Sequence, residues 1–290
     1  RATEAVETYR RATDLAARVG NRAMGRWSSV ALRFQAYFLA EDWDEALRAW
    51  ADPFATDEPA SAFDEIRDLA TRAYFLVARG DPTDDVLRRI EELSGAASDA
   101  FAASAVLYLR SERALVAGDF TTAVDLALQA SDTDDQIGFI YAVLAMRPAL
   151  WMRDLERARA IVARLEADPF HGPSSTAHRL TVRAGLAALE GRAEESVELY
   201  REARARMIDN GDAFSAALIG LDMVTIVGPA VPVVREAAAE ARVVFERVGA
   251  RSYLAFLEAA LAATTAGRHE AAAPAKAAGA IGRSALEAHS

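Results

Sequence analysis

Residues 99–131 read DAFAASAVLYLRSERALVAGDFTTAVDLALQAS. On both sides of Gly118-Asp119-Phe120, apolar side chains recur every three or four residues. This spacing is typical of two amphipathic helices, and Gly-Asp is a turn signal. Because the turn is too short to let the helices separate, each helix must bury its apolar stripe against the other. The stretch therefore predicts an antiparallel helix hairpin.

The same turn returns along the chain. The comparable triplets begin at Glu41, Gly80, Gly118, Arg153, Gly191, Gly228 and Gly267, and their middle residues lie 35 to 39 positions apart. A near-constant spacing of this size predicts a helical solenoid. Small residues recur at fixed offsets from the turns, for example Ser111 before Gly118 and Ala123 after it, which predicts that the paired helices cross closely there.

These patterns predict a single all-helical repeat domain over residues 1–290. We expect 1–19 to be the second helix of an incomplete repeat, followed by repeats at 22–57, 62–95, 99–132, 134–168, 174–210, 212–249 and 250–285. Pro148 lies inside an otherwise helical run, 136–152, and predicts a kink or break near Met146. The absence of Met before Arg1 indicates a domain cut from a longer polypeptide.

Composition limits the classes of function. The 33 basic and 43 acidic side chains give a net charge of −10, which disfavours direct nucleic-acid binding. There is no cysteine, so disulfides and thiolate metal sites are excluded. No apolar run approaches the ~20 residues of a membrane-spanning helix. We therefore expect a cytoplasmic protein, and the abundance of alanine and the near-replacement of lysine by arginine favour a bacterial source.

The repeated pattern of an apolar residue, a small residue, Gly-Asp-aromatic and then alanine resembles the tetratricopeptide repeat (TPR). Gly118-Asp119-Phe120 with Ala123 and Val124 carries this resemblance best. The spacing exceeds the usual repeat of about 34 residues, and the proline expected at the repeat end is mostly missing. The longer period is similar to the arrays of bacterial regulators, such as LuxR-type ATPase regulators and cyclase-associated proteins. The resemblance implies a right-handed superhelix of about seven hairpins with a concave recognition face.

In this family the first helix of each pair lines the concave face, at about 13, 10, 6 and 2 positions before the turn. Carried over to this chain, the resemblance implies a binding groove. Its candidate residues are Arg67, Tyr74, Tyr108, Glu112, Arg147, Trp151, His178 and Asp222. Each of them is also compatible with an ordinary core position or a solvated helix face.

The sequence offers little that points to catalysis. The acidic residues of Asp132-Thr133-Asp134-Asp135 fit a helical magnesium-dependent synthase, but they also fit plain helix capping, and no second acidic motif accompanies them. The four histidines are scattered without metal-ligand spacing. We predict no enzyme activity, no cofactor and no metal site.

The expected function is a non-catalytic protein-interaction or ligand-sensing module of a larger bacterial signalling or transcription-regulatory protein. Its partner would be a protein or peptide, including other domains of the same polypeptide, and neither nucleic acid nor a membrane. A self-association scaffold that forms homo-oligomers is the first alternative. The magnesium-dependent synthase is the second.

Overall fold

The computed structural model describes residues 2–50, 61–96, 100–134 and 137–265. In these ranges the chain forms fourteen α-helices and no β-strand, so the predicted all-helical fold is confirmed. The helices are α1 (Ala2–Val19), α2 (Arg22–Leu39), α3 (Trp43–Ala49), α4 (Ala62–Arg79), α5 (Asp84–Ala96), α6 (Ala100–Val116), α7 (Phe120–Thr133), α8 (Gly138–Trp151), α9 (Leu155–Ala167), α10 (Pro173–Leu189), α11 (Ala193–Asn210), α12 (Ala213–Ile226), α13 (Pro232–Val248) and α14 (Arg251–Thr265).

The predicted turns separate consecutive helices. At the turn between α6 and α7, Gly118 takes a left-handed φ of 79°, and the Asp119 carboxylate accepts a hydrogen bond from the Thr122 amide at 3.2 Å, which caps α7. The Ser111 hydroxyl donates to the Ala123 carbonyl at 2.7 Å, which confirms the close crossing of α6 and α7. The same helix break occurs at the other turns up to Gly228. The turn predicted at Gly267 lies outside the described residues.

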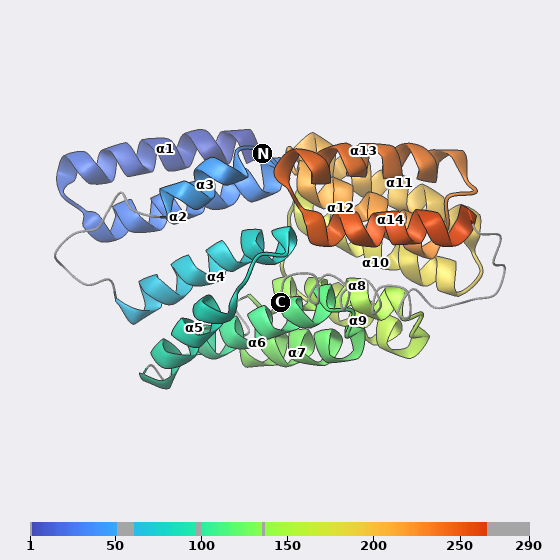
Figure 1. Cartoon of the computed structure of the whole chain (residues 1–290), viewed down its shortest axis with the longest axis horizontal. Helices are drawn as coiled ribbons and strands as arrows, with labels where there is room; N and C mark the ends of the chain where they lie inside the picture. Colours follow the sequence, from blue (N-terminus) through green and yellow to red (C-terminus); the bar gives the residue numbers. More distant parts are fainter. Residues whose placement is uncertain (1, 51–60, 97–99, 135–136, 266–290) are drawn as a thin grey trace.

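The chain closes on itself. Figure 1 shows α4–α9 as a lower row, with α1–α3 and α10–α14 above it. Helix α14 packs against α4, and α12 packs against both α2 and α8. Two hydrogen bonds and an ion pair join α4 and the turn after it to the end of α13 and the start of α14. Ser252 Oγ donates to the Val77 carbonyl at 2.9 Å, Arg79 Nε donates to the Val248 carbonyl at 3.2 Å, and Arg251 pairs with Asp81 at 2.5 Å. Helices from the two halves of the chain therefore cover one another and do not line an open groove.

Aromatic side chains fill the space between the two ends of the chain. Trp43 and Tyr37 stack with ring centroids 5.1 Å apart, and both rings contact Phe214 of α12, at 4.9 and 4.6 Å. On the other side of the core, Trp151 of α8 lies 5.1 Å from Phe256 of α14. Buried aromatic pairs of this kind contribute about 0.5–1.5 kcal/mol each beyond the area that they bury. The core therefore joins segments that are far apart in the sequence.

The break predicted near Met146 is wrong, while the alternative of a kink there stays a prediction. Helix α8 runs without interruption from Gly138 to Trp151. Proline removes only the amide that would bond to the carbonyl of Leu144, and Leu150 and Trp151 beyond it are completely or almost completely buried. Packing of the last turn compensates for the single lost hydrogen bond.

Helices α12 and α13 approach each other closely at Gly220. A Cβ atom at this position would lie 2.7 Å from the backbone carbonyl oxygen of Ala237. Gly220→Ala is expected to lower the free energy of unfolding by about 1–3 kcal/mol, because α13 would have to shift. Gly95 in α5 is a matched control, since a Cβ there meets nothing within 4 Å. Gly95→Ala is expected to raise the stability by up to about 1 kcal/mol. Urea denaturation of both variants checks this, and equal effects would contradict the close approach.

Candidate functional site

Seven of the eight candidate residues come together on the inner helices. We call this group the inner cluster: Tyr74 from α4, Tyr108 and Glu112 from α6, Arg147 and Trp151 from α8, His178 from α10, and Asp222 from α12. The positions contributed by the first helix of each pair therefore converge, although they span about half of the chain. Whether they bind a ligand remains a prediction.

An ion pair between α8 and α12 forms the centre of the inner cluster. Arg147 Nε and Nη2 donate to the two carboxylate oxygens of Asp222 at 2.8 and 3.0 Å, and Trp151 Nε1 donates to Asp222 Oδ1 at 3.0 Å. Asp222 is completely buried. Burial alone would lower the pKa of Arg147, but the charge and hydrogen bonds of Asp222 outweigh it and hold this pKa above its ordinary value. The paired, bidentate geometry fixes α8 and α12 relative to each other.

Glu112 of α6 is a buried carboxyl beside this ion pair. Its main described contact is the Tyr253 hydroxyl of α14, which donates to Glu112 Oε2 at 3.4 Å. Burial raises the pKa of Glu112 from 4.5 to about 7, despite the opposing effects of Arg147 and Tyr253. The raised pKa favours the protonated carboxyl, which can both donate and accept a hydrogen bond.

Tyrosines form the side of the inner cluster that faces α2. The rings of Tyr74 and Tyr108 stack with centroids 4.4 Å apart, and Tyr37 of α2 meets Tyr74 edge to face at 5.6 Å. The hydroxyl of Tyr200 in α11 is buried, with no hydrogen-bond partner among the described residues. A buried hydroxyl without a partner costs stability, so this group has unused hydrogen-bonding capacity.

His178 lies on α10, near the charge of Arg147. Burial and the nearby charge of Arg147 lower its pKa from 6.5 to about 4, so the ring is neutral at physiological pH. Tyr74 and His178 are partly exposed, whereas Tyr108, Glu112, Arg147, Trp151 and Asp222 are buried. Of the seven members, Tyr74 and His178 are therefore the ones that a partner could contact without separation of the helices.

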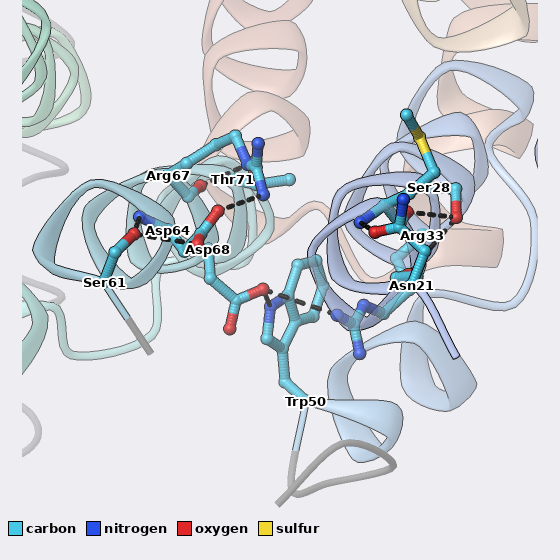
Figure 2. Close-up of polar contacts among 11 residues, drawn as sticks. Asn21, Ser28, Arg33, Trp50, Ser61, Asp64, Arg67, Asp68 and Thr71 are labelled. Atoms are coloured by element: carbon cyan, nitrogen blue, oxygen red, sulfur yellow. Dashed lines mark hydrogen bonds and ion pairs between the residues drawn. The ribbon is translucent and has the colours of Figure 1, made fainter. Parts of the chain in front are cut away.

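Arg67 lies apart from the inner cluster. Its Nη2 donates to Asp64 at 2.9 Å, and its guanidinium lies 5.8 Å from the ring centroid of Phe63. Figure 2 shows the neighbouring contacts between α2 and α4, where Trp50 lies between Asp68 and Arg33. Trp50 Nε1 donates to Asp68 Oδ1 at 2.6 Å, and Arg33 Nη2 reaches the same oxygen at 3.4 Å.

This second group is also partly desolvated. Burial lowers the pKa of Arg33 and of Arg67, and burial raises the pKa of Asp68, with the opposite charges acting against these shifts. The contacts shown in Figure 2 hold α4 against α2 and Trp50. None of them connects Arg67 to the inner cluster.

The acidic residues proposed for the synthase alternative do not share one environment. Asp132 is exposed and pairs with Arg164 of α9 at 2.7 Å, whereas Asp134 is buried at the end of α7. Asp135, His269 and His289 lie outside the described residues. Across the described ranges there is no group of three or more histidine, aspartate or glutamate side chains able to hold a metal ion. No helix in those ranges has both the length and the apolar character to cross a lipid bilayer.

The sequence patterns missed three tyrosines of this region. Tyr253 stands 14 positions before Gly267, one outside the offsets used for the groove. Tyr37 and Tyr200 had no positional signal.

Comparisons with protein-family models, characterised proteins and solved structures gave no match.

Proposed function

We propose that this chain is a non-catalytic binding module, with TPR-like hairpins arranged as a right-handed superhelix that closes on itself. The convergence of seven candidate residues from five helices supports this proposal more than any other single observation. In a repeat array, residues at equivalent positions of successive hairpins form one continuous surface. Such surfaces suit the recognition of proteins or peptides.

The chemistry of the inner cluster favours binding over turnover. Arg147, Asp222 and Trp151 hydrogen bond to one another, so their polar atoms are largely occupied in holding the helices together. Tyr74 and His178, the two partly exposed members, offer a tyrosine side chain and a neutral imidazole to a partner. The resemblance to regulator arrays favours a signalling role in a bacterium, with a protein partner.

Affinity capture from cells that naturally express the chain tests this function. We expect the wild-type chain to recover a partner. The double variant Tyr74→Ala and His178→Ala should recover at least about tenfold less of that partner, which corresponds to 1.4 kcal/mol. Glu236→Ala on the exposed face of α13 is the control and should recover the partner as the wild type does. Circular dichroism melting shows whether the double variant is folded. Equal recovery by all three folded chains would contradict a role for the inner cluster.

Self-association is a second candidate function. Sedimentation over a range of concentrations separates the two, because a sensor of other molecules is expected to stay monomeric, whereas a scaffold should form oligomers as concentration rises. A dimer that persists at the lowest concentration would favour the scaffold.

A further inference from the structure

Helix α14 covers one side of the inner cluster. The Tyr253 hydroxyl donates to Glu112 Oε2 of α6 at 3.4 Å, and the ring of Phe256 lies 5.1 Å from that of Trp151 in α8. Tyr253 and Phe256 are themselves buried by these contacts and by the rest of the core. Ser252 joins the start of the same helix to the Val77 carbonyl of α4. Separation of α14 from its neighbours would therefore uncover Glu112 and Trp151.

The buried charges beneath α14 do not balance. Two carboxyl groups, those of Glu112 and Asp222, lie near one guanidinium, that of Arg147. Asp222 accepts two hydrogen bonds from Arg147 and one from Trp151. Within the described residues, the one hydrogen bond to Glu112 comes from Tyr253. Ionised Glu112 would add a second negative charge to a desolvated site whose cation is already bound, so the closed arrangement favours the protonated carboxyl.

The phenols around Glu112 stay neutral in the range where a carboxyl titrates. Burial raises the pKa of four tyrosines on α2, α4, α6 and α14 above the ordinary value of 10. They are Tyr37, Tyr74, Tyr108 and Tyr253. None of them can supply the positive charge that an ionised Glu112 would need.

The remaining titratable groups do not replace Glu112 as the source of a pH effect. His178 of α10, whose pKa burial lowers to about 4, is neutral above that pH. Burial also raises the pKa of Asp222, against the effect of its bonds from Arg147 and Trp151. On the helices packed against α6, the acids of α5 and α7 have arginine partners. These pairs are Glu91 with Arg110, Asp84 with Arg113, Asp125 with Arg157 and Asp132 with Arg164.

We propose that Glu112 is a pH-sensitive switch for α14, whose protonated carboxyl keeps α14 closed over the inner cluster and whose ionisation favours release of the helix. The turn between α13 and α14, where Gly249 has a left-handed φ of 68°, is the hinge. Release would open Trp151 to a partner. This role in access rests on the binding function proposed above, whereas the release itself does not.

The direction of the effect follows from the proton balance. Burial raises the pKa of Glu112 from 4.5 to about 7 in the closed state, and a carboxyl released into water returns to its ordinary value. The closed state therefore binds the proton more tightly than the open state, and its advantage falls between about pH 4.5 and about pH 7. The equilibrium constant for release is expected to rise on the order of a hundredfold across this range.

The chain contains no cysteine, so a single introduced thiol can report release. Leu257→Cys places the thiol on α14, and Leu165→Cys places it on α9, which packs against α8 and α10. Both leucines are completely buried, so the two variants are matched. An aromatic disulfide reagent that reacts in mild acid labels each full chain from about pH 5 to about pH 8. Near about pH 8 we expect the thiol on α14 to react at least about tenfold faster than the thiol on α9, because local opening needs less free energy than global unfolding.

Glu112→Gln, added to Leu257→Cys, isolates the proton. The amide cannot ionise, so labelling should be slower on the order of a hundredfold near about pH 8 and by only about fourfold near about pH 5. Ser252→Ala is the control, because it removes the hydrogen bond to Val77 without removing a titratable group. It should speed labelling by the same factor at every pH.

Two results would overturn the proposal. Equal labelling of the two thiols near about pH 8 would show that α14 opens only when the whole chain unfolds. An effect of Glu112→Gln that is absent or does not change with pH would show that its proton does not control release. Either result leaves the proposed binding function standing, because no partner enters the measurement. If melting shows Leu257→Cys to be unfolded, hydrogen exchange of α14 in the cysteine-free chain, with and without Glu112→Gln, gives the same comparison.

Discussion

Replacing Asp222 with alanine is expected to lower the free energy of unfolding by about 3–5 kcal/mol. The substitution leaves the guanidinium of Arg147 buried without its bidentate partner, and it removes the acceptor of Trp151 Nε1. A buried charge without a partner is among the most destabilising changes in a protein core. Urea denaturation at neutral pH, followed by circular dichroism, measures the loss.

Two further variants identify the cause of that loss. Asp222→Asn keeps the size of the side chain and removes its charge, so its effect should lie between those of the wild type and the alanine variant. The double variant Arg147→Met and Asp222→Leu removes both charges and should recover most of the stability, because apolar replacement of a buried pair is often neutral or stabilising. If the double variant were as unstable as Asp222→Ala, lost packing would be the cause rather than the unpaired charge.

The contribution of Glu112 to stability is expected to decrease by about 3 kcal/mol as the pH rises from about 4.5 to about 7. Burial raises the pKa of Glu112 from 4.5 to about 7, so the folded state holds this proton more tightly than the unfolded state. Each unit of pKa corresponds to about 1.4 kcal/mol. The stabilising effect is complete below the unfolded-state pKa, and it is lost as the pH rises through the folded-state value.

Glu112→Gln isolates this effect, because the amide keeps the shape of the protonated carboxyl and does not titrate. The free energies of unfolding of the variant and the wild type should agree near about pH 4.5, and the variant should be more stable by up to about 3 kcal/mol near pH 8. The lowered pKa of His178 makes the free energy of unfolding rise with pH between about pH 4 and pH 6.5. Because His178 is present in both proteins, its effect cancels in the comparison. A difference that did not change with pH would show that Glu112 does not titrate in this range.

Local periodicity was enough to predict the helices, and the offsets implied by the TPR resemblance picked out the residues of the inner cluster. The turns were readable because glycine and aspartate mark helix ends, and Gly118 with Asp119 does so in the structure as expected. Tyr74, Glu112, Arg147 and Asp222 each stand six positions before a turn. Equivalent positions of stacked hairpins face the same side, so these residues could be grouped without knowledge of how the stack curves.

The closure of the chain could not be predicted in this way. The contact of α14 with α4 joins residues about 170 positions apart, such as Ser252 and Val77. No local pattern specifies such a contact, which depends on how all the intervening helices pack. The same limit explains why Tyr253 was missed, and why Trp151 and Asp222, assigned to an open groove, are instead buried between helices.

The junction of α4 with α14 also changes how the protein should come apart. An open solenoid frays from its ends, because each terminal hairpin depends on one neighbour. Here Arg251 and Ser252 bind near the end of α4. Melting of α14 would therefore also remove contacts that stabilise the N-terminal half. We therefore expect these contacts to couple unfolding of the two segments, so that the chain unfolds with the all-or-none cooperativity of a globular domain.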